Sequence, residues 1–271
     1  MANFDNLETL KFEVNEGIAV VTLNRPMAGN AFNLKMGEEL KAVLQEVNEN
    51  PEIRVMVTTG AGDMFFCGGG DMQMLTDVNQ NPVEAVEVYK KAGIFIPDLY
   101  NLTKPCIAAV NGFATGAGTS LALAHDFILA SDNARFGANF ISIAFTPDSG
   151  ATYLMAQALN KQRLAELMFT GRVIKADQAK EWGIFNHVYP KDTFWDEVMK
   201  MAKRIANQPP LAIRYDKILL REAFKNDLFT QADLEASMNG ILITTDDFLE
   251  GIKSAMATMR GEKYKPTFTG K

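Results

Sequence analysis

Residues 106–118 read CIAAVNGFATGAG, an apolar run that leads directly into a cluster of glycines. The run at 106–111 predicts a buried strand, and the glycines open a predicted helix at 116–124. Glycine permits positive φ and lets a ligand approach the main chain closely. The first N–H groups of a helix lack partners within the helix. This stretch therefore predicts a strand end where backbone amides face outward.

A second glycine cluster, FFCGGGD at 65–71, follows a predicted strand at 53–59. Ligands of open α/β folds bind where parallel strands end, and two N–H groups that converge there would bind a developing oxyanion. Spacing alone supports tight turns equally well. Neither cluster has the spacing of a dinucleotide-binding loop, and no Gly-Lys-Ser or Gly-Lys-Thr of a phosphate-binding loop occurs.

The chain around these clusters reads as α/β. An apolar strand at 18–24 and the strand at 53–59 enclose an amphipathic helix with apolar residues at Met36, Leu40, Val43, Leu44 and Val47. Strand, helix, strand predicts parallel strands joined by a crossover. A helix at 83–102 and a strand at 126–130 continue the pattern.

The pattern changes near residue 194. We predict an α/β core over residues 1–193 and a helical region over 194–271, interrupted at Pro209 and Pro210. The run ILITT at 241–245 is ambiguous between strand and helix.

Composition narrows the function further. The chain has 271 residues and a net charge of -6, which argues against a nucleic-acid partner. Its two cysteines have no Cys or His at metal-ligand spacing, so we expect no metal site. The N-terminus lacks the apolar core of a signal peptide, and no run of 18 apolar residues occurs. We expect a cytoplasmic protein without a membrane span.

An ordered set of short motifs runs through nearly the whole chain. They are Asn24-Arg25-Pro26, Asn30-Ala31-Phe32, the 65–71 loop, Lys104-Pro105, Asn111-Gly112, the 116–118 glycines, Phe136-Gly137, Pro147-Asp148-Ser149-Gly150, Thr170-Gly171 and ADQAKEWG at 176–183. Together they resemble the crotonase, or enoyl-CoA hydratase/isomerase, superfamily. The resemblance implies ββα superhelical turns, a C-terminal helical trimerisation region and a homotrimer or hexamer. It also implies an acyl-CoA substrate, with no cofactor besides the coenzyme A that the substrate carries.

The resemblance also assigns site residues. The oxyanion donors would be the backbone amides of Gly70 and Ala117, although family members usually have glycine at the second position. Arg25 and Lys263, the latter from a neighbouring subunit, would meet the coenzyme A phosphates. Asp71 would border the substrate, although its sequence position also fits a helix cap. The remaining expected substrate contacts are Ala31, Gly68, Met72, Ser120 and Phe140.

The carboxylates indicate the reaction. The resemblance to hydratases predicts glutamates at two positions that Ser120 and Phe140 occupy here. Neither side chain can activate water, so hydration is disfavoured. Asp148 matches the single acidic residue of the Δ3,Δ2-enoyl-CoA isomerases and of the ring-epoxide isomerases of phenylacetate breakdown. Locally, Pro-Asp-Ser-Gly is also a turn or helix-cap signal. We expect Asp148 to move a proton beside the thioester carbonyl, aided by a pKa that Phe140, Ile143 and Phe145 raise.

Three alternatives remain open. The scaffold could support hydration, or hydrolysis of a C–X or C–C bond with Asp148 as nucleophile, as in the family's dehalogenases. The third alternative is a relative that binds acyl-CoA without catalysis. The two histidines, His125 and His187, are expected to be structural, as is Asp126 at a strand end. Met64, Met72 and Met74 are typical of core packing.

Overall fold

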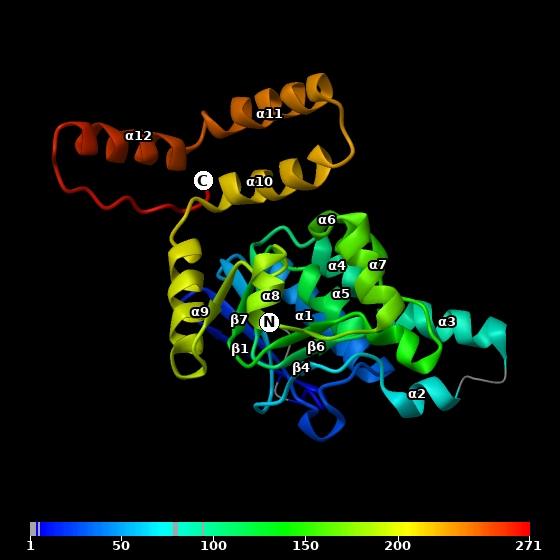
Figure 1. The fold of residues 1–271 in the computed structure, drawn as a ribbon. Helices are drawn as coiled ribbons and strands as arrows, with labels where there is room; N and C mark the ends of the chain where they lie inside the picture. The colour runs from blue at the N-terminus through cyan, green and yellow to red at the C-terminus, as the bar shows by residue number, and fades with distance from the viewer. Residues whose placement is uncertain (1–3, 5, 78–80, 94) are drawn as a thin grey trace.

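Two sheets form the centre of the molecule (Figure 1). The computed structural model describes residue 4 and residues 6–77, 81–93 and 95–271, so part of the N-terminal stretch tested for a signal peptide lies outside the described residues. The larger sheet contains, in spatial order, β1 (Leu10–Asn15), β2 (Ile18–Leu23), β3 (Val55–Gly60), β5 (Cys106–Val110), β7 (Phe127–Ser131) and β10 (His187–Tyr189). The smaller sheet contains β4 (Phe65–Cys67), β6 (Phe113–Thr115), β8 (Arg135–Gly137) and β9 (Ile174–Lys175).

The larger sheet is parallel from β2 onward. β1 pairs with β2 in antiparallel register, whereas β2, β3, β5, β7 and β10 pair in parallel. Helix α1 (Leu34–Glu49) connects β2 to β3, and Ile18 lies opposite Val55 in the register of those strands. The parallel strand–helix–strand unit predicted from the sequence is therefore confirmed.

Alternating side chains of the larger sheet form two separate cores. Ile18, Val55 and Ile107 belong to a cluster with α9 (Lys191–Ala206), which covers one face of the sheet. The neighbouring residues Ala19 and Met56 belong to the larger cluster on the other face. Because both faces are covered, the strands are apolar throughout rather than alternating in polarity.

A repeated unit explains how the glycine clusters meet. A strand of the larger sheet continues into a strand of the smaller one: β3 leads to β4, β5 to β6 and β7 to β8. Helix α5 (Ala117–Leu123) follows β6 directly. Since β4 and β6 are parallel neighbours, the loops that leave their carboxyl ends lie side by side. This is the ββα turn that the resemblance implies.

The predicted element at 83–102 is helical over most of its described residues. The structure describes α3 (Pro82–Gly93) and α4 (Phe95–Tyr100), and residue 94 between them lies outside the described residues. Helix α4 buries Phe95, Ile96 and Leu99, whereas α3 is largely exposed.

The remaining short helices surround the smaller sheet. They are η1 (Pro26–Ala28), α2 (Met72–Asp77), η2 (Asn139–Ile143), α6 (Ala151–Ala158), α7 (Lys161–Thr170) and α8 (Ala176–Glu181).

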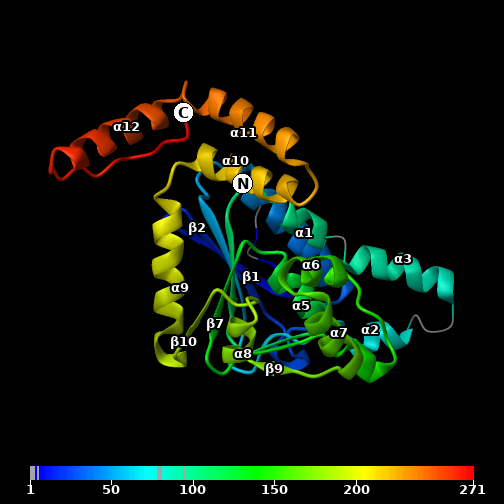
Figure 2. The ribbon, with the colours of Figure 1, turned by 45° about the horizontal axis from the view of Figure 1, so that its top comes forward.

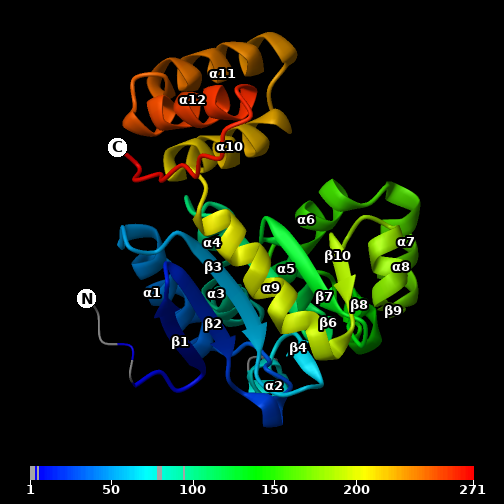
Figure 3. The same ribbon diagram turned by 90° about the vertical axis from the view of Figure 1, so that its left-hand side faces the viewer.

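Three C-terminal helices stand apart from the sheets (Figures 2 and 3). They are α10 (Pro210–Ala223), α11 (Leu228–Leu242) and α12 (Asp246–Met259). The ambiguous 241–245 run is the end of α11 and the turn after it, not a strand. α9 instead packs against the sheet, and the boundary at residues 193/194 stays a prediction. Among the described helices, none combines the length and the apolar character needed to cross a bilayer.

Candidate active site

The two glycine clusters present two backbone amides. Gly69 has φ +109 and Gly116 has φ +55, and each directly precedes a predicted donor, Gly70 or Ala117. These are conformations that only glycine adopts easily. A methyl group added to Gly69 would lie 3.1 Å from the Thr115 carbonyl oxygen and 3.4 Å from the Ala117 nitrogen. The first loop therefore lies against the Ala117 amide in close contact.

Hydrogen bonds hold both loops but leave the two amides unused. Phe32 N–H donates to the Gly69 carbonyl at 2.7 Å, and Asp71 N–H donates to the Phe32 carbonyl at 2.8 Å. Gly116 N–H donates to the Gly137 carbonyl at 3.1 Å and to Asn139 Oδ1 at 3.0 Å. Within the part of the chain that the structure describes, the N–H groups of Gly70 and Ala117 have no acceptor. Ala117 N–H is unpaired because it begins α5, and both amides are free to donate to an external acceptor.

Asp148 is tied to the helix that begins at the second amide. It precedes α6, and its main-chain carbonyl accepts a hydrogen bond from the Ser120 hydroxyl at 3.3 Å. Ser120 follows Ala117 by three residues in α5, which places both on the same face about 5 Å apart along the axis. Asp148 Oδ1 is buried and has no partner among the described residues. Burial raises the pKa of the Asp148 carboxyl, and the neighbouring Ser149 hydroxyl opposes that rise.

A cavity of about 680 Å³ opens beside this carboxyl. Its wall combines Asp148 with apolar and aromatic side chains, among them Ile96, Leu154 and Tyr89. The Tyr89 ring packs against Phe145 with centroids 5.3 Å apart. Burial and the charge of Asp148 raise the pKa of Tyr89, so its O–H is retained as a donor. One titratable carboxyl therefore faces a largely apolar space with a phenol nearby.

A second cavity, of about 390 Å³, borders the first glycine loop. Five of the predicted contact residues line it: Ala31, Gly68, Gly70, Asp71 and Met72. Arg25 is fixed beneath it, because its guanidinium donates to Asp71 Oδ2 and to the Ala31 carbonyl, both at 2.7 Å. Asp71 Oδ1 also accepts from Gln73 N–H at 2.9 Å, which confirms Asp71 as the cap of α2. Burial works against the Asp71 charge, but the hydrogen bond from Arg25 and those from the α2 amides lower its pKa overall.

The geometry has a known counterpart. A family model described as Enoyl-CoA hydratase/isomerase matches residues 13–271. The chain belongs to the enoyl-CoA hydratase/isomerase family, within the crotonase superfamily.

Relatives of known name span the full chain. The sequence is 34% identical to the 1,2-epoxyphenylacetyl-CoA isomerase of Escherichia coli (strain K12), covering 98% of this chain and 100% of that protein. It is 33% identical to the crotonyl-CoA hydratase of Syntrophomonas wolfei, covering 97% and 99%. The crystal structure of an enoyl-CoA hydratase from Bacillus anthracis superposes with a TM-score of 0.90 at 30% identity, covering 97% and 100%. The crotonase fold is thus established, and CoA-thioester chemistry is common to the names of these relatives.

The structure places the expected residues at two cavities: Asp148 lines the larger one, and Gly70 lines the smaller one with four of the predicted contacts. Ser120 is buried behind Asp148 rather than at a cavity wall, and Phe140 is buried in η2. Lys263 lies exposed in the tail after α12, and the described lining of the two cavities does not include it. Its role stays a prediction that requires a neighbouring protomer.

Other expectations have clear outcomes. His125 is structural as expected: its ring nitrogens contact the Leu121 carbonyl and Thr58 Oγ1, each at 2.8 Å, and burial lowers its pKa to about 4. Asp126 anchors its strand as expected by accepting from Cys106 N–H at 2.7 Å. The core-packing prediction is wrong for Met64 and Met72. Both side chains are exposed, and they flank the first glycine loop at its two ends.

Sequence reasoning missed the aromatic part of the site. Tyr89, Tyr100 and Tyr153 line the larger cavity, and Tyr100 and Tyr153 meet edge to face with centroids 6.1 Å apart. Gly93 approaches Ser149 so closely that an added methyl would lie 2.8 Å from the Ser149 hydroxyl. The signal available in the sequence was the spacing of Tyr89 and Gly93, four residues apart and so on one face of the predicted helix.

Proposed function

We propose that this family member is an acyl-CoA isomerase that converts a Δ3 double bond to a Δ2 double bond. Asp148 removes a proton from the carbon between the thioester carbonyl and the double bond. The electrons delocalise into a dienolate whose oxygen accepts hydrogen bonds from the amides of Gly70 and Ala117. The Asp148 carboxylic acid then returns the same proton two carbons further along, so no net proton is consumed.

The observation that carries this proposal is the buried, unpartnered Oδ1 of Asp148 beside an apolar cavity. A carboxyl whose pKa is raised by desolvation is a stronger base than an exposed one, as proton abstraction from carbon requires. The structure adds no second carboxylate at the two positions where hydratases would have one, because Ser120 and Phe140 occupy them. One acid–base group supports isomerisation better than hydration.

The amide pair would supply most of the rate enhancement. A carboxylate is a weak base for a carbon acid, so the negative charge that develops on the thioester oxygen must be stabilised. Loss of one oxyanion donor typically costs about 3–4 kcal/mol. Because glycine conformations set both amides in advance, little reorganisation is needed in the transition state.

The names of the relatives support this division of roles. An isomerase and a hydratase both match the chain over almost its full length. The shared scaffold thus fits coenzyme A thioesters in general, and we assign the reaction from Asp148. Hydrolysis with Asp148 as nucleophile is less well supported, because no histidine occurs at 72–104 and Phe140 stands where dehalogenases have tryptophan.

Coenzyme A and the assembly belong to the same proposal. No cofactor beyond the coenzyme A of the substrate is needed. We propose a homotrimer or hexamer formed through α10–α12, because these helices expose large apolar residues such as Leu228, Phe229 and Met259. In such an assembly Lys263 of a neighbouring subunit would meet the coenzyme A phosphates. A reducing cytoplasmic setting agrees with the two free cysteines, Cys67 and Cys106.

Substrate conversion tests the proposal directly. Purified protein is incubated with a 3-enoyl-CoA, and the ultraviolet absorbance of the conjugated thioester is followed. A parallel reaction with a 2-enoyl-CoA is analysed for the 3-hydroxy product. We expect isomerisation to exceed hydration clearly. Hydration without isomerisation would contradict the single-carboxylate mechanism.

A further inference from the structure

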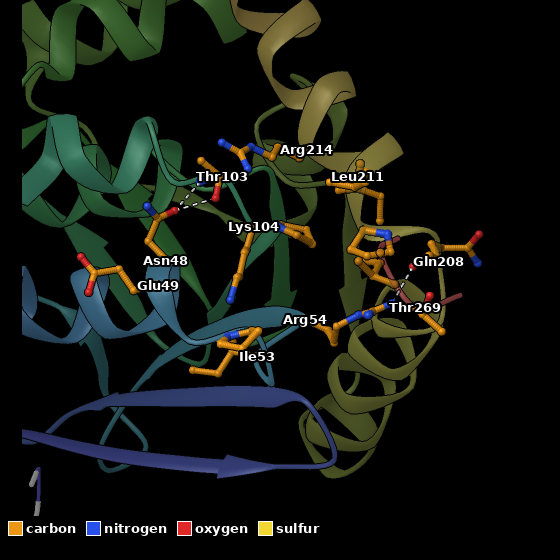
Figure 4. Close-up of a pocket in the computed structure, with 16 residues that line it drawn as sticks. Asn48, Glu49, Ile53, Arg54, Thr103, Lys104, Gln208, Leu211, Arg214 and Thr269 are labelled. Carbon is orange, nitrogen blue, oxygen red and sulfur yellow. Dashed lines mark hydrogen bonds between the residues drawn. The ribbon is translucent and has the colours of Figure 1, made fainter. Parts of the chain in front are cut away.

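A third cavity, of about 290 Å³, lies where the core meets the C-terminal helices (Figure 4). One side comes from the core, at residues 48–54 and 103–105. The other side comes from the end of α9, the start of α10 and the C-terminal tail. It shares no residue with the two cavities of the proposed active site.

The lining of this cavity is unusually cationic for this protein. The chain as a whole has a net charge of -6. Three cations nevertheless line the cavity, Arg54, Lys104 and Arg214, against one carboxylate, Glu49. Among the ion pairs of the described residues, none includes any of these three cations. The cavity therefore has an excess of positive charge without a protein counter-charge in contact.

Lys104 shows the electrostatic cost of this arrangement. Its half-buried ammonium donates to the carbonyl of Asn50. Burial and the nearby positive charge of Arg54 lower the pKa of Lys104 to about 8. A partly desolvated ammonium next to a second cation is unfavourable, and a bound anion would offset the repulsion between the two cations.

The other two cations extend the positive region across the junction. Arg54 donates through one amino group to the carbonyls of Gln208 and Phe268, each at 3.2 Å. Figure 4 shows Lys104 directed towards the Ile53–Arg54 stretch and Arg54 reaching across to Gln208 and Thr269. Arg214 stands on α10 near Thr103 in the same view. Cations from the core and from α10 thus border one space.

The start of α10 adds to the positive electrostatic potential of the cavity. This 14-residue helix begins at Pro210, and no side chain caps its first turn. The positive end of a helix attracts anions, and Pro210 and Leu211 both line the cavity. The helix end contributes only as an addition to the three side-chain cations.

We propose that this cavity is a binding site for a small phosphate-bearing anion, which bridges the core to α10. The anion would accept hydrogen bonds from the Lys104 ammonium and from the guanidinium groups of Arg54 and Arg214. Arg has the planar geometry that suits phosphate oxygens, and Lys adds a point charge. This site is independent of the proposed isomerase reaction.

Calorimetric titration of the full-length protein tests the site. Inorganic phosphate and glycerol phosphate serve as separate probes, with chloride added to match ionic strength. The comparison of the two probes shows whether free phosphate or a phosphate ester is preferred. We expect saturable binding that weakens about tenfold in Arg214→Gln and in Lys104→Gln, as for loss of one charge-assisted hydrogen bond. Arg214 is exposed and makes no ion pair in the described part of the chain, so its replacement should leave the fold intact.

A matched control removes one positive charge elsewhere. Lys161 is exposed on α7 and does not line the cavity, and Lys161→Gln should bind phosphate like the unmodified protein. A second readout is acetylation of Lys104 by an amine-reactive reagent, located by mass spectrometry. Phosphate should protect Lys104 in the unmodified protein and protect it less in Arg214→Gln. Absence of saturable binding, or equal binding and equal protection in all variants, would overturn the proposal.

Discussion

The two halves of the proposed active site are built from different materials. The amide half consists of main chain, at the ends of two neighbouring strands, and glycine conformations fix it. The carboxylate half consists of side chains, Asp148 in the loop before α6 and Tyr89 on α3, which line an open cavity. The amide half can stabilise an oxyanion in any thioester reaction. In the proposed mechanism the carboxylate half selects which proton moves, so a family can change its chemistry there while keeping its scaffold.

The largest expected loss of activity comes from a substitution that disturbs the main chain of the amide half. Gly69→Ala forces a side chain into φ +109 and within 3.1 Å of the Thr115 carbonyl. We expect the Gly70 amide to turn, and kcat to fall about 10²–10³-fold. Steady-state kinetics with a 3-enoyl-CoA measure the change.

The control for that substitution lies on α11. Gly240 is helical and has no neighbour within 4 Å of an added methyl group, so Gly240→Ala should leave kcat unchanged. An unimpaired Gly69→Ala enzyme would show that the amide half does not depend on this conformation.

The pH dependence of kcat/KM examines the carboxylate half. Asp148 acts as a base only when ionised, and burial raises its pKa above the ordinary aspartate value of 3.8. Activity should therefore fall about tenfold per pH unit below that raised pKa. The midpoint of the fall in kcat/KM on the acidic side is measured in well-buffered solutions of constant ionic strength. A profile that stays flat down to the ordinary aspartate range would exclude Asp148 as a desolvated base.

Tyr89→Phe gives a smaller effect on the same half. The substitution removes the hydroxyl near Asp148 and keeps the ring against Phe145. If this hydroxyl donates one neutral hydrogen bond to the bound substrate, its removal predicts a decrease in kcat/KM of about two- to tenfold. Tyr189→Phe, in β10 and outside both cavities, is the matched control. Equal values for the two variants would remove Tyr89 from the site.

The smallest effect is one of stability. The raised pKa means that the folded protein favours the protonated form of Asp148. Its contribution to the free energy of unfolding is present at low pH and is lost as the pH rises through the pKa of Asp148 in the folded state. At neutral pH the buried charge is a cost. Asp148→Asn should therefore increase the free energy of unfolding by about 0.5–2 kcal/mol at pH 7.

Denaturant titrations at several pH values test that gain. The difference between Asp148→Asn and the unmodified protein should shrink as the pH is lowered. A variant that is less stable at pH 7 would show that the Asp148 charge is compensated in the folded protein.

The same contrast explains what the sequence predicted well. Glycine clusters after apolar strands are local signals, and strand pairing brings the 68–70 and 116–118 loops together once the sheet is parallel. The turn that holds Asp148 was equally visible from its Pro-Asp-Ser-Gly string.

The cavity around the carboxylate could not be predicted in this way. Its shape depends on how Gly93 approaches Ser149, a contact between residues far apart in the sequence. The aromatic wall follows from tertiary contacts that no local spacing encodes.

The central claim is that one carboxyl, Asp148, takes a proton from a carbon whose enolate the two amides stabilise. The most direct measurement is exchange of α-carbon hydrogen for deuterium in an acyl-CoA dissolved in deuterated buffer, followed by NMR. The account predicts rapid exchange with the unmodified protein and none above background with Asp148→Asn, although that variant still binds the acyl-CoA. Undiminished exchange by Asp148→Asn would contradict it.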